Sequence, residues 1–171
     1  MEEAKTLASE LASETYGTPD KPFDFVEADT ETALICESDT AVREKISSAM
    51  KTIGYRTTET TSAKDALKNM RFHAYKVVIL NENFDASDRE GNAVLNYLAS
   101  LNMSTRRQIF VALLSSQFRT TDNMAAFNKS VNLIINTSNI DDFGQIIKQG
   151  VAENEAFYHV FKETLRKKGR I

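Results

Sequence analysis

Apolar and polar positions along the chain fall into short blocks of two kinds. The first kind is a compact apolar run rich in β-branched residues, typical of a strand buried on both faces. Such runs occur at 32–36 (TALIC), 76–80 (KVVIL), 109–114 (IFVALL) and 131–135 (VNLII). A fifth segment, 55–60 (YRTTET), is rich in threonine and alternates, so it predicts a strand at the edge of a sheet.

The second kind of block has apolar residues at helical spacing. Asp39 and Ser62 are suitable N-caps for two of these segments, and Gly54 is suited to end the first. The last segment has one apolar stripe, which comprises Phe157, Val160, Phe161 and Leu165. The pattern predicts helices at 40–53, 63–72, 91–102, around 124–127, 139–150 and 153–168.

Strands and helices therefore alternate through 32–150 as five strand–helix units. Such units close right-handed and need a parallel sheet covered on both faces, which predicts a doubly wound α/β domain of strand order 2-1-3-4-5. Ligands in this fold bind where the strand order reverses, between the carboxyl ends of the first and third strands. We expect 1–31 to be an extension that ends in a linker, and 151–171 to be a helical extension.

Charge is distributed unevenly over the 171 residues. Residues 1–31 hold nine acidic and two basic residues, a net charge of −7, whereas 162–170 carries +4. The whole chain has a net charge of −3, which argues against a general nucleic-acid binder. Basic residues are also common in the last turn of a helix, so the basic end does not by itself indicate a ligand.

Other compositional features exclude several classes of protein. The single cysteine, Cys36, lies in an apolar run and cannot form a disulfide framework or a zinc site. No apolar run approaches the roughly 20 residues of a membrane span. The N-terminus (MEEAKTLASE) lacks the basic and apolar regions of a signal peptide, so we expect a cytoplasmic protein.

The third predicted strand continues into asparagine in the run VVILNENF, at 77–84. The residue after such a strand lies at the sheet edge where α/β proteins place their chemistry. Asn81 can donate and accept hydrogen bonds there, but an amide is neither an acid nor a nucleophile.

Five motifs in this order give the chain its resemblance to a known family. They are ALICESDTAVREKI, VVILNENF, EGNAVLNYL, FVALLSS and LIINTSNIDDF, within residues 32–150. Together they resemble the receiver domain of two-component response regulators, a flavodoxin-like fold that takes part in phosphorelays. The chain has no glycine-rich phosphate loop and no GxSxG motif that would favour another α/β family.

The resemblance implies a set of site positions. A working receiver carries an acid pair after the first strand, an acceptor aspartate after the third, a Ser/Thr after the fourth and a lysine after the fifth. Here the acid pair falls on Glu37 and Ser38, with Asp39 next to them, and the acceptor on Asn81. The other positions fall on Ser115 for Ser/Thr, Asn136 for lysine, Thr137 for the following proline and Leu133 for the aromatic switch residue.

Phosphoryl transfer depends on positioning and on neutralising charge, so loss of the acceptor and the lysine removes its chemistry. The resemblance therefore indicates a pseudo-receiver: a non-enzymatic, cofactor-free module that signals through contacts with a protein partner, with a homodimer as an alternative. Asn81 either locks one state through a hydrogen bond to Ser115 or Ser38, or has no role. Glu37 and Asp39 are weak candidates for a cation site.

Two further readings stay open at this stage. The chain could be an active receiver that accepts phosphate on Asp85 or Glu82 with Mg²⁺. It could also bind a small ligand at the switch point of the sheet.

Two structural predictions follow. The Asn136–Thr137 peptide bond should be trans, because the cis form without proline costs about 3 kcal/mol. The last helix should bury Phe157, Phe161 and Leu165, either on the domain itself or across a two-fold dimer, because burial of each is worth roughly 2 kcal/mol.

Overall fold

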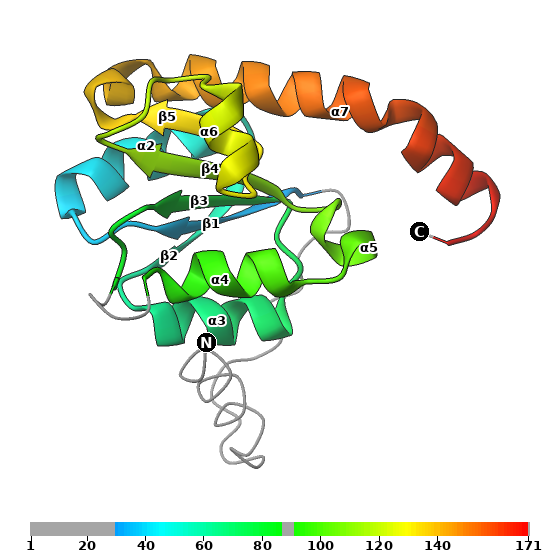
Figure 1. The fold of residues 1–171 in the computed structure, drawn as a ribbon, viewed down its shortest axis with the longest axis horizontal. Coiled ribbons are helices and arrows are strands. Elements are labelled where there is room, and N and C mark those ends of the chain that lie inside the picture. Colours follow the sequence, from blue (N-terminus) through cyan, green and yellow to red (C-terminus); the bar gives the residue numbers. More distant parts are fainter. Residues whose placement is uncertain (1–29, 87–90, 171) are drawn as a thin grey trace, which may run out of the picture.

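A single five-stranded parallel sheet organises the computed structural model, which describes residues 30–86 and 91–170 (Figure 1). The strand order is β2-β1-β3-β4-β5, as the sequence predicted. The predicted extension and linker at 1–31 fall almost wholly outside the described residues. The strands are β1 (Thr32–Cys36), β2 (Arg56–Thr60), β3 (Val77–Asn81), β4 (Phe110–Ser115) and β5 (Leu133–Asn136).

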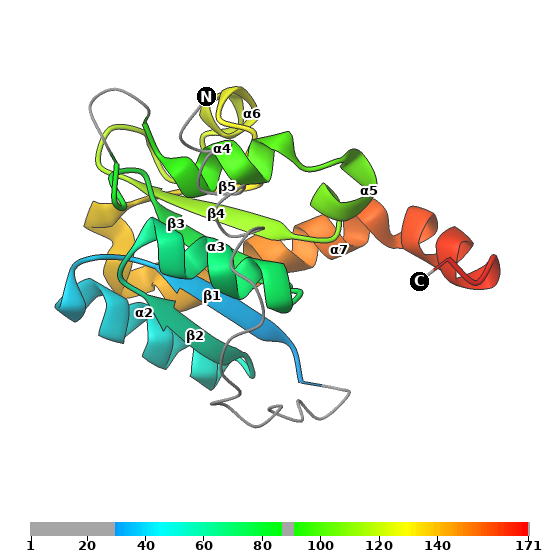
Figure 2. The ribbon, with the colours of Figure 1, turned by 90° about the horizontal axis from the view of Figure 1, so that it is seen from below.

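Helices cover both faces of this sheet (Figures 1 and 2). Alternate strand residues point to opposite faces, and this separates two apolar clusters. The helices are α2 (Thr40–Thr52), α3 (Ala63–Phe72), α4 (Ala93–Ser100), α5 (Met103–Arg106), α6 (Asn123–Asn128) and α7 (Phe143–Lys167), with the 3₁₀ helix η1 at Thr137–Asp142. One cluster packs under α3, α4 and α6, and the other under α2 and α7.

The strand register brings four polar positions to one edge of the sheet. Cys36 pairs with Leu80, so the residues that follow these two, Glu37 and Asn81, lie side by side. Likewise Ser115 pairs with Asn136 on the neighbouring strands. Parallel strands end at the same edge, so the predicted site positions converge there.

The predicted helix over 91–102 is divided in the structure. Helix α4 ends at Ser100, and Leu101 is extended, with φ −63° and ψ 144°. Asn102 then caps α5, its side chain accepting a hydrogen bond from the backbone N–H of Thr105 at 2.9 Å. An asparagine at this position favours a new cap over continuation of the helix, so the prediction of one helix was wrong.

The two helices predicted at 139–150 and 153–168 are in fact one helix of 25 residues, α7. Gly150 lies inside it rather than at its end. A Cβ at this position would lie 2.9 Å from Leu133 Cδ2 and 3.3 Å from Phe110 Cζ. The glycine therefore permits a close approach of the helix to the sheet, and the prediction of two separate helices was wrong.

The C-terminal half of α7 runs past the edge of the sheet in both views (Figures 1 and 2). Phe157 is 80% exposed and Phe161 38% exposed, whereas Leu165 is half-buried. The expectation that the domain itself buries all three was therefore wrong, because the sheet ends before the helix does. Burial across a dimer stays a prediction. Over the described residues, no helix is long and apolar enough to cross a membrane.

Candidate functional site

The centre of the site is a hydrogen bond between the ends of β1 and β3. The amide Nδ2 of Asn81 donates to Glu37 Oε2 at 2.7 Å, and the backbone N–H of Asp39 donates to Glu37 Oε1 at 2.9 Å. Glu37 is buried, and each of its carboxylate oxygens thus has a donor. The predicted partners of Asn81, Ser115 and Ser38, were wrong: its amide nitrogen turns to the acid on the neighbouring strand.

The rest of the Asn81 amide is also engaged. Its Oδ1 accepts from the backbone N–H of Asn83 at 2.9 Å, which tightens the turn after β3. In this arrangement the amide presents its nitrogen to the carboxylate and its oxygen to the loop. An aspartate could accept the loop N–H but could not donate to Glu37, so asparagine specifically suits this pair.

Asp39 and Ser38 both lie on the exposed loop between β1 and α2. Asp39 caps α2, its Oδ1 accepting from the backbone N–H of Val42 at 3.0 Å. Arg43 holds the same loop: its Nη1 donates to the carbonyls of Glu37 and Ser38 at 2.8 and 3.3 Å, and its Nε pairs with Glu59 at 3.5 Å. The acid nearest the site therefore serves the helix N-terminus.

Asn92 fixes the other side of Asn81. It is buried, and its Nδ2 donates to the carbonyls of Asn81 and Glu82 at 2.9 and 3.3 Å. Its Oδ1 accepts from the backbone N–H of Leu95 at 3.1 Å and so caps α4. One asparagine side chain thereby joins the loop after β3 to the helix that follows.

Ser115 and Glu82 stabilise the loop that follows β4. Ser115 is buried, and its hydroxyl accepts from the backbone N–H groups of Gln117 and Phe118 at 3.0 and 3.3 Å. Glu82 Oε1 accepts from the backbone N–H of Ser116 at 3.1 Å. Both side chains are therefore committed to the turn between β4 and α6.

Asn136, at the position that the resemblance assigns to lysine, forms hydrogen bonds with the backbone. Its Nδ2 donates to the carbonyl of Phe118 at 2.7 Å, and its Oδ1 accepts from the N–H of Ser138 at 2.9 Å. The described residues include no cis peptide bond, so the bond from Asn136 to Thr137 is trans, as predicted. Leu133, which the resemblance assigns to the aromatic switch position, is buried in the apolar cluster under α2 and α7.

Asp85 is turned toward another element. Its Oδ2 accepts from the backbone N–H of Ala63 at 2.7 Å, at the first residue of α3. Its backbone has φ 45°, a left-handed conformation that aspartate tolerates better than most residues. The loop after β3 is thereby tied to α3, and Asp85 makes its hydrogen bond away from Glu37.

The described residues contain no group of three or more His, Cys, Asp or Glu side chains that could hold a metal ion. Glu37 and Asp39 come together, but through the backbone N–H of Asp39 rather than through two carboxylates. The buried thiol of Cys36 is also no nucleophile, since burial raises its pKa to about 12.

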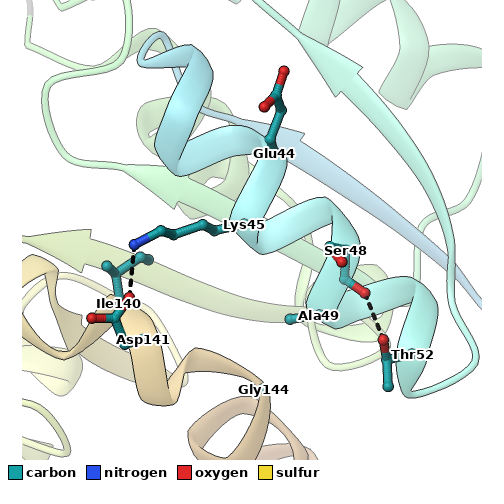
Figure 3. Close-up of a pocket in the computed structure, with 8 residues that line it drawn as sticks. All are labelled: Glu44, Lys45, Ser48, Ala49, Thr52, Ile140, Asp141 and Gly144. Carbon is teal, nitrogen blue, oxygen red and sulfur yellow. Dashed lines mark hydrogen bonds and ion pairs between the residues drawn. The ribbon is translucent and has the colours of Figure 1, made fainter.

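Two surface hollows lie elsewhere in the fold. The larger, of about 520 Å³, lies between α2 and the start of α7, where the Lys45–Asp141 ion pair of 2.7 Å crosses it (Figure 3). The smaller, of about 240 Å³, lies between the C-terminal ends of α3 and α4. Glu37, Asn81, Ser115 and Asn136 line neither hollow.

Asn92 and Arg43 were missed in the sequence. Asn92 precedes an apolar helical run, and this capping pattern could have identified its role in α4. The contacts of Arg43 with the loop before its own helix have no comparable sequence signal, because they depend on the path of the chain between Glu37 and Asp39.

The chain is similar to solved structures of other proteins, but not to any family of sequences. No protein-family model and no curated protein matches the chain. The chemotaxis response regulator CheY4 of Vibrio cholerae superposes with a TM-score of 0.57 at 11% identity, over 71% of this chain and 98% of that chain. A CheY-like receiver domain from Methylobacillus flagellatus gives 0.53 at 21% identity, over 71% and 98%.

HP1043, an orphan response regulator of H. pylori, gives a TM-score of 0.53 at 16% identity, over 70% of this chain and 95% of that chain. The strand order and these superpositions show that the chain has the fold of the receiver domains of response regulators.

Proposed function

We propose that this protein is a signal-transduction module of the pseudo-receiver type, which acts by binding a protein partner without being phosphorylated. The observation that carries the proposal is the 2.7 Å hydrogen bond from Asn81 to Glu37. It places an amide donor on the buried acid, at the position where the family has a second carboxylate.

The chemistry of the site supports this proposal. An acyl phosphate requires a carboxylate oxygen as nucleophile, and the amide of Asn81 has none to offer. Transfer also requires cations on the phosphoryl oxygens, and Asn136 at the lysine position is neutral and bonded to the loop carbonyl of Phe118. The Asn81–Glu37 pair instead gives the domain one fixed arrangement of its loops.

We assign residues 32–150 to the interaction module and treat 1–31 and 151–171 as extensions that act with it. A homodimer is the alternative form of partnership. HP1043, an orphan response regulator, has a similar fold, and this likeness supports a role in signal transduction.

Intact-mass spectrometry after incubation with acetyl phosphate and Mg²⁺ tests the proposal. We expect the mass of the unmodified chain only. A phosphoryl-sized increase would contradict the proposal, and the Asp85→Asn and Glu82→Gln variants would then identify the acceptor. Beryllofluoride with Mg²⁺, followed by NMR, provides an independent test, since an active receiver would show saturable shifts around residues 37–39 and 81.

A further inference from the structure

An uncovered apolar face lies on the C-terminal half of α7. It consists of Phe157, Val160 and Phe161, at i, i+3 and i+4, with exposed fractions of 80%, 72% and 38%. Phe157 packs edge-to-face on Tyr158 at 4.9 Å, and Arg107 of the loop after α5 lies over the Phe161 ring at 5.3 Å. Exposure of three large apolar side chains on one stripe is unfavourable, and such a contiguous patch is typical of an interaction surface.

A basic end follows this face directly. Residues 162–170 carry a net charge of +4. Within the described residues, Lys162 pairs with Glu155 and Lys167 with Glu163, whereas no ion pair is seen for Arg166, Lys168 or Arg170. The natural occupant of this surface is therefore both apolar and acidic.

The chain itself contains a segment of that chemistry. Residues 1–29 hold eight acidic and two basic residues, a net charge of −6, together with the apolar group Phe23, Phe25 and Val26. We infer that residues 1–29 cover the apolar face of α7, with the Phe23–Val26 group on the aromatic rings and the carboxylates along the basic end.

The path of the chain supports this occupant over others. Lys76 Nζ contacts Glu31 Oε1 at 3.0 Å and Glu155 Oε1 at 3.1 Å, so one ammonium group joins the end of the segment to α7. Phe157 lies two residues beyond Glu155, which is about 3 Å along the axis of α7 and roughly 200° around it. Phe25 is six residues before Glu31, a stretch that spans up to roughly 20 Å when extended. The segment is therefore tethered within reach, at an effective concentration on the order of millimolar.

A tryptophan reporter tests the inference in the full chain, since the natural sequence has no tryptophan. We expect the Phe157→Trp variant to emit at a short wavelength and to resist quenching by acrylamide. Adding Phe23→Ser, Phe25→Ser and Val26→Ser should shift the emission to longer wavelength and increase quenching. Phe127→Trp on α6, where Phe127 is 79% exposed, is the matched control and should not respond to these changes.

Two further experiments distinguish residues 1–29 from a second copy of the chain as the occupant: reversal of the charge of the basic end, and variation of the protein concentration. Reversal of the basic end by Arg166→Glu, Lys168→Glu and Arg170→Glu should expose the reporter as the triple serine change does. A reporter that is fully exposed in the otherwise natural chain would overturn the inference. So would protection that survives the serine changes and rises with protein concentration alongside dimer in sedimentation equilibrium, because a second copy would then be the occupant.

Discussion

Asn81 Nδ2 lies 2.7 Å from Glu37 Oε2, and this contact joins the carboxyl ends of β1 and β3. It replaces what would be the repulsion of two acids by a charge-assisted hydrogen bond. Because Glu37 is buried, we expect the contact to affect both the stability of the fold and the reactivity of the site toward phosphate. Unfolding experiments measure the first effect, and phosphorylation assays measure the second.

Asn81→Asp should destabilise the fold near neutral pH by about 1–3 kcal/mol, because it removes the donor and places a second carboxylate against a buried one. Two acids at this distance share a proton more readily than isolated ones, so the folded state of the variant binds more protons than the unfolded state. The penalty is therefore present at high pH and declines as the pH falls. Urea unfolding at neutral and acidic pH, with and without Mg²⁺, measures it.

Asn83→Asp is the matched control for this prediction. It makes the same chemical change two residues away on an exposed side chain, so it should alter stability little at either pH. Equal losses for the two variants would contradict a specific role for the Asn81–Glu37 pair. Recovery of Asn81→Asp, but not Asn83→Asp, on adding Mg²⁺ would indicate that a cation can replace the lost donor.

Asn81→Asp alone should not give rapid phosphorylation, whereas combining it with Asn136→Lys should begin to restore reactivity. The lysine would supply the positive charge that Asn136 lacks, and loss of one such cation typically costs several kcal/mol of transition-state stabilisation. The intact mass after acetyl phosphate and Mg²⁺ gives the rate of labelling for each variant.

Asn136→Lys also breaks the hydrogen bond that the Asn136 side chain donates to Phe118 and the one that it accepts from Ser138. Circular dichroism must therefore show that the double variant is folded before its labelling is compared. Asn136→Lys alone, without the carboxylate at 81, is the matched control and should remain unlabelled. Fast and near-complete labelling of Asn81→Asp alone would contradict the importance given to Asn136.

Asn92→Ala should destabilise the fold by about 2–3 kcal/mol, since it removes the cap of α4 together with two donors to the loop after β3. Asn92→Asp keeps the cap acceptor but loses the donors, and should be destabilising for that reason alone. Asn102→Ala, at the exposed cap of α5, should cost less. Chemical denaturation ranks the three, and an equal loss for Asn92→Ala and Asn102→Ala would argue against a role for the loop donors.

Glu155→Gln should weaken the dependence of stability on acid. Partial burial raises the pKa of Glu155, but Lys162 and Lys76 outweigh it and lower the pKa overall. Because the pKa of Glu155 is lower in the folded state, its carboxylate stabilises the fold at pH values above the pKa of the unfolded state. This stabilisation is lost as the pH falls through the pKa of the folded state. The effect of such a half-exposed pair is at most about 1 kcal/mol.

Thermal unfolding across the acidic range, below the ordinary glutamate pKa, follows this loss. Glu153→Gln is the control, because Glu153 accepts from Gln149 and has no ion pair among the described residues. The two substitutions should therefore differ in their acid limbs. Identical curves would show that the Lys76–Glu155–Lys162 chain of charges contributes nothing measurable.

Sequence patterns were sufficient for the sheet but not for the connections. Strands β1, β3, β4 and β5 are buried on both faces. Such burial requires a continuous run of apolar, mostly β-branched residues, which is recognisable in the sequence. The helix Ala63–Phe72 was also predicted with its observed bounds, because Ser62 caps it and accepts from the N–H of Asp65. Local chemistry decides both features.

The predictions were wrong where contacts between residues distant in sequence determine the structure. Glycine ends many helices, yet Gly150 lies inside α7 and allows this helix to pass close to Leu133 and Phe110. Motif order predicted the site positions, but it did not predict the partner of Asn81. An amide can face several neighbours, and only the register of β1 against β3 selects Glu37.

The continuity of α7 gives its far end a fixed rotational phase. Its first turns are locked by Phe143 and Ile147, which are fully buried beside the sheet, and the helix continues unbroken to Lys167 over roughly 37 Å. Each residue advances a helix by about 100°, so one residue inserted after Val151 would carry Phe157 away from its present direction. The packing of Phe143 and Ile147 against the sheet thus determines the direction in which the aromatic face at the far end of α7 points.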